Sequence, residues 1–326
     1  MCACCAVRCG DYAHDCGAAM KLIQGTYMDC SVEEYRAWPA INYSSLADFN
    51  ESQDHALMEK PAKSYFEEGT AFELQIEDMA TGTEKFSERF FIADAPGAMP
   101  DDLAGWIERG EDLESKYVWN KPNKKTGEVR PSLTHEKKHL WLDECRKHPG
   151  KMPVGADRKK MLDKMVENFM NMQPFSDILV ENTMFEILRH AKFQVPIIWY
   201  VGKVRKKALI DCLVETPDTI YVFDIKTAAD MSRFEWMIKS KYFLQECHYS
   251  AGLGQIYPDK QIVWRFLVSS KAEPYIAQPF AVDPFSMSDN GMQAYYDLCT
   301  RYQAWVDEGR PPKGWLEFKS VKVYFD

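Results

Sequence analysis

Two aspartates and a lysine lie in neighbouring apolar segments near the middle of the chain. Asp211 lies within Ala208–Leu213 and Asp224 within Tyr221–Thr227, so each carboxylate interrupts a run of apolar residues. A charge in a buried strand is unfavourable unless it is paired or binds a metal. Lys226 follows Asp224 by two residues, which on a strand places both side chains on the same face. Two carboxylates held together favour a divalent cation between them, so the pattern predicts a metal-dependent site.

The chemistry that these residue types support is magnesium-dependent cleavage of a phosphodiester. The acids would hold Mg²⁺, which polarises a phosphate and lowers the pKa of a bound water. Lys226 would position that water, or help to deprotonate it, and would offset charge in the transition state. Taken alone, the Asp-x-Lys triplet favours a simpler interpretation, an ion pair at the end of a strand.

Gln245 and Tyr249 add to this pattern because they are four residues apart on a helix predicted to follow Lys226. Residues with this spacing share one face of a helix. A glutamine amide and a tyrosine hydroxyl there can reach a DNA phosphate or a base edge next to the metal. The alternative is an ordinary half-buried aromatic residue with a polar neighbour.

The surrounding sequence predicts the elements that position these residues. Runs rich in β-branched and aromatic residues predict strands over 193–201, 207–213, 219–225, 262–269 and 275–282. Apolar periodicity predicts helices over 61–79, 134–147, 156–172, 231–253 and 293–307, with a serine-capped short helix after Ile41. Helices first, then three strands, a long helix and two strands indicate an α/β core behind a helical N-terminal part.

Asp211, Asp224-Ile225-Lys226 and Gln245-x-x-x-Tyr249 together resemble the core of the PD-(D/E)XK nuclease superfamily in its RecB-like branch. Further stretches resemble the exonuclease VIII (RecE-type) nuclease domain found in phages and prophages. In the order of that family, they are Ile41–Leu46, Gly69–Leu74, Phe86–Phe90 and Leu267–Tyr275. The ordered set spans residues 40–305.

The resemblance implies a restriction-endonuclease-like fold, in which helices flank a mixed β-sheet. It implies an exodeoxyribonuclease that uses Mg²⁺, or Mn²⁺, to degrade one strand of linear double-stranded DNA from 5′ to 3′. The product would be single-stranded DNA for a single-strand annealing recombinase, and family members can form homo-oligomeric rings around DNA. The roles that it implies are metal binding and catalysis by Asp211, Asp224 and Glu73, metal binding by the carbonyl of Ile225, catalysis by Lys226, and DNA binding by Gln245 and Tyr249.

Two positions depart from the family pattern. Glu73 stands where the family has a histidine, and glutamate still offers an oxygen ligand to Mg²⁺. Gln194 stands where the family often has a glutamate, and a neutral amide binds metal poorly. Two further interpretations therefore stay open: a catalytically impaired DNA-binding protein on the same fold, and a related endonuclease of repair or restriction.

The charge distribution favours a basic track on an acidic body. The net charge is −9, and residues 1–118 carry 9 Lys and Arg against 23 Asp and Glu. Residues 119–160 reverse this balance with 12 against 5, and residues 186–207 with 6 against 1. A DNA-binding track would include Lys203, Arg205, Lys206 and Lys207. The competing interpretation is that these are ordinary solvated faces.

The domain prediction divides the chain at residue 41. Residues 1–40, which hold six of the ten cysteines, are predicted to be a flexible extension, and 41–326 a single nuclease domain. Within it, 41–185 would be mainly helical, 186–305 the catalytic core and 306–326 a tail. Cys212 and Cys247 lie in apolar patterns typical of buried thiols. No apolar run reaches the length of a membrane span and no signal peptide is visible, so we expect no membrane association and a cytoplasmic location, by resemblance in a bacterial host of a phage or prophage.

Overall fold

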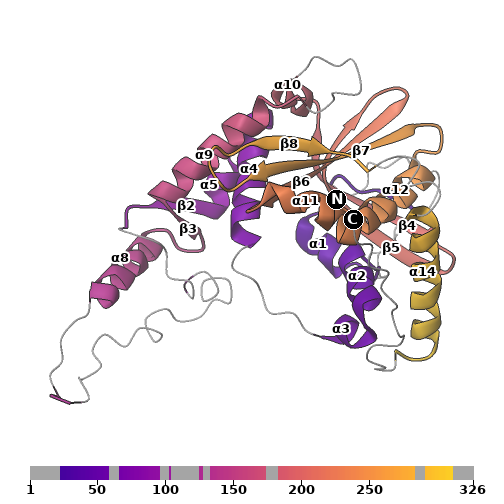
Figure 1. Ribbon diagram of the computed structural model, residues 1–326, viewed down its shortest axis with the longest axis horizontal. Coiled ribbons are helices and arrows are strands. Elements are labelled where there is room, and N and C mark those ends of the chain that lie inside the picture. Colours follow the sequence, from indigo (N-terminus) through magenta and orange to yellow (C-terminus); the bar gives the residue numbers. More distant parts are fainter. Residues whose placement is uncertain are drawn as a thin grey trace, which may run out of the picture.

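Three consecutive strands form an antiparallel meander inside the sheet (Figure 1): β4 (Lys192–Val201), β5 (Val204–Glu215) and β6 (Thr219–Ala228). A two-residue turn joins β4 to β5, and Gly202 adopts a φ of 59° there. This left-handed conformation favours glycine and matches the twist of a tight hairpin. The computed structural model describes residues 23–58, 66–95, 103, 125–127, 133–173, 183–282 and 291–310.

Within the described residues the main sheet has six strands, in the order β1-β4-β5-β6-β7-β8. β7 (Gln261–Ser270) runs parallel to β6 along its whole length, since a helical connection carries the chain back between them. β8 (Ala277–Phe280) and the short β1 (Gly25–Thr26) pair antiparallel with β7 and β4. The fold is therefore α/β with a mixed sheet flanked by helices, which confirms the predicted fold class.

Helices cover both faces of the sheet (Figure 1). One apolar core joins β5, β6 and β7 to α4 (Phe66–Thr81), α9 (Ala156–Met170) and α10 (Met184–Leu188). On the opposite face, α11 (Phe234–Met237) and α12 (Phe243–Ile256) pack on the strands. An outer core then joins α12 to α2 (Tyr43–Glu51) and α14 (Met292–Asp307).

The remaining described elements are short or lie at the periphery. They are α1 (Val32–Ala37), α3 (Gln53–Leu57), α5 (Lys85–Arg89), α8 (Leu133–Lys147) and a parallel pair of strands, β2 (Phe90–Ala93) and β3 (Met152–Gly155). None of the described helices is long and apolar enough to cross a membrane.

Most of the elements predicted from the sequence are present with shifted ends. The start predicted for α4 near residue 61 lies outside the described residues, and the predicted cap of α2 was wrong. Asn42, not a serine, accepts the backbone N–H of Ser45. The helix predicted over 231–253 is a 3₁₀ turn (Met231–Arg233), α11, a π-helical turn (Ile238–Tyr242) and α12 in succession.

The prediction of a flexible extension up to residue 40 was wrong for residues 23–40. This segment contributes β1 and α1, and Tyr35 and Trp38 are buried against Ile198 of the sheet. The five cysteines that precede residue 17 lie outside the described residues. Cys212 and Cys247 are buried free thiols, as predicted.

One close approach fixes α12 on the sheet. Gly252 faces the indole ring of Trp199 on β4, and a Cβ at this position would lie 2.7 Å from two ring carbons. The absence of a side chain therefore allows the helix to pack directly on the ring. Gly254, two residues later, has no neighbouring atom within 4 Å of where its Cβ would be.

Candidate active site

Asp211 and Asp224 occupy facing positions on β5 and β6. The antiparallel pairing runs through Cys212↔Phe223, and the next register position would join the two aspartates. The regular ladder stops there because a side chain replaces the backbone partner. The N–H of Ile225 donates to Oδ2 of Asp211 at 3.1 Å. A backbone N–H of β6 therefore holds the carboxylate of Asp211 in place.

The sheet is also irregular on the other side of Asp211. The pairs Phe193↔Cys212 and Val195↔Ile210 put Gln194 opposite Asp211, and Gln194 adopts a φ of 48°. This left-handed conformation costs a residue with a side chain about 1–2 kcal/mol. Irregular strand positions of this kind redirect side chains and are frequent next to active sites. Gln194 thus lies beside the candidate metal ligand.

Asp224 is 2% exposed and has two close side-chain partners. Its Oδ2 lies 2.5 Å from Nζ of Lys226. Its Oδ1 accepts a hydrogen bond from Nε2 of Gln245 at 2.5 Å. The strand thus supplies the lysine, and α12, which packs over the strand, supplies the amide. Three of the residues singled out in the sequence therefore meet at one carboxylate.

Glu73 lies on α4, one of the helices that pack with α9 and α10 on one face of the sheet. Its neighbours Phe72 and Ile76 are fully buried in the core under the sheet. Burial raises the pKa of Glu73 well above its ordinary value, and repulsion from Asp211 and Asp224 raises it further. The helix therefore brings a third carboxyl group within electrostatic reach of the pair.

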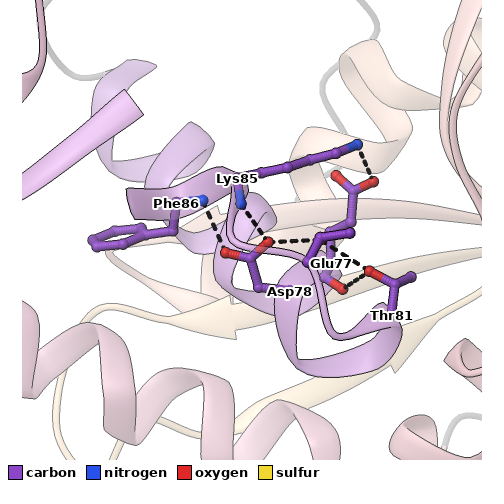
Figure 2. A network of polar contacts seen from close by, with 6 residues as sticks. Glu77, Asp78, Thr81, Lys85 and Phe86 are labelled. Atoms are coloured by element: carbon purple, nitrogen blue, oxygen red, sulfur yellow. Dashed lines mark hydrogen bonds and ion pairs between the residues drawn. The ribbon is translucent and has the colours of Figure 1, made fainter. Parts of the chain in front are cut away.

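A polar network fixes the end of the helix that carries Glu73 (Figure 2). Asp78 accepts the backbone N–H groups of Lys85 at 2.7 Å and Phe86 at 2.8 Å, which are the first donors of α5. Lys85 also forms an ion pair with Glu77 at 2.6 Å. Because Asp78 caps the next helix, the turn between α4 and α5 is held at both ends. These contacts fix the turn at the end of the helix that carries Glu73.

The electrostatics of the site favour an added positive charge. Burial, and then repulsion from Asp224, raise the pKa of Asp211 from 3.8 to about 7. Burial also raises the pKa of Asp224, although Lys226 opposes the rise. Burial alone would lower the pKa of Lys226, but Asp224 and Asp211 raise it on balance. One lysine thus offsets a group of three carboxyls, and a cation would relieve the remaining repulsion.

A further carboxyl group next to the site escaped the sequence analysis. Glu246 on α12 is 7% exposed, and burial raises its pKa to about 8. Arg265 opposes this rise, whereas Asp224 adds to it. At neutral pH the side chain is therefore largely uncharged. Its position between Gln245 and a buried cysteine was the available signal, because an acid inside an apolar helix face is uncommon.

Two tyrosines near the site were not predicted. The hydroxyl of Tyr43, on α2, donates to the carbonyl oxygen of Lys241 at 2.8 Å. The ring of Tyr242 lies 5.7 Å from Nζ of Lys226 and 5.8 Å from Nζ of Lys241. Tyr242 belongs to the π-helical turn, and such turns are frequent at functional sites. The sequence offered no local signal for this contact.

Tyr249 has a supporting position in this conformation. Its hydroxyl donates to the carbonyl oxygen of Leu209 at 3.3 Å, and its ring packs edge-on against Trp264. Gln245 is likewise engaged, by Asp224. The DNA-binding roles of Gln245 and Tyr249 therefore stay predictions, whereas their contacts here connect α12 to β5 and β6.

The basic track predicted around residue 205 was wrong at two of its four positions. Lys206 is fully buried, with Nζ 5.3 Å from the ring centre of Tyr302. Lys207 is 5% exposed, and its Nζ donates to the carbonyl oxygens of Tyr35, Arg36 and Trp38 at 2.9, 2.9 and 3.0 Å. These carbonyls end α1, where a cation is favourable. Neither lysine is available to a phosphate.

The other two basic residues remain candidates for DNA binding. Lys203 is exposed in the turn between β4 and β5. Arg205 is half-buried, and its Nε donates to the hydroxyl of Tyr200 at 3.1 Å. Two of the four basic residues predicted to bind DNA on this hairpin therefore remain accessible.

The donor set fits a hard cation that takes part of its ligands from elsewhere. Among the residues that the structure describes, no three His, Cys, Asp or Glu side chains converge to form a ligand set by themselves. Mg²⁺ is commonly held by one or two carboxylates, with waters and substrate phosphates completing its shell. Asp211 and Asp224 can supply that pair.

Comparison with known proteins gives little beyond these observations. No protein-family model matches the chain, and no curated protein matches it. A crystal structure of a "Putative exonuclease" from Eubacterium rectale is similar over 82% of this chain and 97% of that chain, with 12% sequence identity and a TM-score of 0.34. The site is therefore assigned from the residues of this chain.

Proposed function

We propose that this protein is a metal-dependent nuclease of the PD-(D/E)XK superfamily, with DNA as its substrate. The observation that carries the proposal is the meeting of Asp211, Asp224 and Lys226 at facing positions of two central strands, with Gln245 bonded to Asp224. A structural ion pair would need one acid and one base. Besides Asp224, which pairs with Lys226, the site holds the further carboxyls of Asp211 and Glu73, and this excess of negative charge suits a cation.

Each residue has a definite task in this scheme. A bound Mg²⁺ would supply Lewis-acid polarisation of the phosphate and a water of lowered pKa. Asp211 and Asp224 would hold it, and Gln245 would keep Asp224 oriented by the hydrogen bond already present. Lys226 would hold the attacking water or neutralise charge on the phosphate oxygens. The carbonyl of Ile225 and Glu73 would complete the protein oxygens.

Within this class we propose an exodeoxyribonuclease that degrades one strand of linear double-stranded DNA from 5′ to 3′. The ordered motifs of the RecE-type domain support this narrower proposal. The single strand left behind would serve a single-strand annealing recombinase, and a homo-oligomeric ring around DNA would keep the enzyme on its substrate.

The decisive experiment compares substrates and metals. The purified protein should digest linear duplex DNA with Mg²⁺ or Mn²⁺, leave covalently closed DNA intact and be inactive in EDTA. Phosphorothioate linkages at the 5′ ends should block digestion, whereas the same linkages at the 3′ ends should not. Cleavage of closed DNA would instead support an endonuclease, and DNA binding without digestion would support a catalytically impaired protein.

A matched pair of variants ties any activity to the site. Asp224→Asn should lose at least about 100-fold in rate, because it removes the charge of a carboxylate that would hold Mg²⁺. Asp218→Asn changes an exposed aspartate in the neighbouring turn and should leave the rate unchanged. Full activity of Asp224→Asn at ordinary Mg²⁺ concentrations would contradict the assignment.

A further inference from the structure

Trp236 is the most exposed large apolar side chain among the described residues, with 69% of its surface accessible. Two residues before and after it, Phe234 and Ile238 are buried. Phe234 packs against the rings of Phe266 and Phe280, at centre distances of 6.3 and 5.1 Å. A step of two residues turns a helix by about 200°. The packing that fixes α11 on the sheet therefore also holds the indole outward.

The segment that carries Trp236 connects the two elements of the candidate active site. It runs from the end of β6, which bears Asp224 and Lys226, to the start of α12, which bears Gln245. The ring centre of its last residue, Tyr242, lies 5.7 Å from Nζ of Lys226 in the site and 5.8 Å from Nζ of Lys241. The segment that carries Trp236 is therefore joined at both ends to elements of the candidate active site.

Unpaired positive charge lies on the side of Trp236 that leads to α12. Lys239 and Lys241 are exposed, and neither has an ion-pair partner in the described part of the chain. On the other side, Arg233 pairs with Asp230 at 3.3 Å, and Glu235 is exposed. A polyanion would therefore be favoured only along the stretch from Trp236 towards α12.

We propose that Trp236 is a stacking platform for an unpaired nucleobase next to the scissile phosphate, with Lys239 and Lys241 on the neighbouring phosphates. This inference rests on the proposed nuclease function and adds the substrate feature that is recognised. Every base offers a flat π-face to an indole, so stacking binds single-stranded DNA without sequence preference. Lysines beside the ring hold the backbone that carries the base.

The test measures binding in EDTA, where no digestion occurs. The probe is a fluorescein-labelled duplex with a short single-stranded overhang, used with normal bases or with abasic nucleotides in the overhang, and Kd is read by fluorescence anisotropy. Trp236→Ala should bind the normal probe about 5- to 150-fold more weakly than the parent. Trp236→Phe keeps a ring that can stack and should retain most of the affinity. On the abasic probe the parent and Trp236→Ala should bind equally.

Phe185→Ala is the matched control. Phe185 is an exposed aromatic residue on α10 with Arg189 5.9 Å from its ring centre, and its loss should leave Kd unchanged. Equal affinity of Trp236→Ala and the parent for the normal probe would overturn the inference and leave the proposed function standing. An equal loss on both probes would also overturn it, because the ring would then not be contacting a base. Failure of the parent to bind DNA would overturn both proposals.

Discussion

Replacing Asp211 by asparagine should stabilise the metal-free protein while it abolishes activity. Asparagine keeps the shape of the side chain and can still accept the N–H of Ile225. The aspartate has a pKa raised from 3.8 to about 7 in the folded protein. The folded state therefore binds a proton more tightly than the unfolded state. This stabilisation is complete below pH 3.8 and is lost as the pH rises through 7.

The magnitude follows from the size of the shift. At 1.36 kcal/mol per pKa unit, the rise from 3.8 to about 7 makes the ionised carboxylate cost about 4 kcal/mol in the folded protein above pH 7. The asparagine side chain would never ionise. The free energy of unfolding of Asp211→Asn minus that of the parent should therefore rise by about 3 kcal/mol between pH 5 and pH 8.

Urea denaturation in EDTA at the two pH values measures this gain, and digestion of linear DNA with Mg²⁺ measures the loss of function. Asp218→Asn, in the exposed turn, is the matched control for replacing an aspartate by asparagine. The reasoning is refuted if Asp211→Asn is less stable than the parent at pH 8, or if the difference between them is the same at both pH values.

Three further substitutions test the packing that supports the site, each by urea denaturation. Gly252→Ala should destabilise the protein by about 1–3 kcal/mol because its Cβ would overlap the indole ring that it faces. Gly254→Ala, in open space on the same helix, should stabilise the protein by about 0.5–1 kcal/mol. Equal effects of the two substitutions would contradict the close approach. Lys207→Met should cost about 3 kcal/mol because it removes three hydrogen bonds from a charged donor to the end of α1, and Lys203→Met should cost nothing measurable. Asp78→Ala should cost about 1–2 kcal/mol through loss of the cap on α5, and an unchanged midpoint would show that the cap is dispensable.

The meander at the centre of the fold could be predicted because its strands carry their own signal. β-Branched and aromatic runs marked β4, β5 and β6, and the short turn between β5 and β6 put Asp211 and Asp224 on neighbouring strands. The spacing of Asp224 and Lys226 then placed them on one face. All of this depends on residues close together in sequence, where local geometry decides the outcome.

What the sequence did not predict depends on distant partners. Lys207 belongs to a stretch that resembles a solvated basic face. Its acceptors are the carbonyls of Tyr35, Arg36 and Trp38, and the sequence around Lys207 contains no pattern that predicts them. Gln194 adopts its φ of 48° on β4 opposite Asp211 of β5, a pairing between residues 17 positions apart in the sequence. The exposure of Trp236 follows from the burial of Phe234 on the opposite side of a helical turn, which is decided by β7 and β8.

The contact of Lys207 with the end of α1 bears on how much of the chain is needed to fold. A fragment beginning at Ile41 would keep the ammonium group inside the protein and remove all three of its acceptors. It would also uncover the face of β4 on which Tyr35 and Trp38 rest. An autonomous unit must therefore include α1. Proteolysis between β1 and α2 should accordingly loosen the β4–β5 hairpin, and amide exchange in that hairpin would report the cut long before any loss of the outer helices.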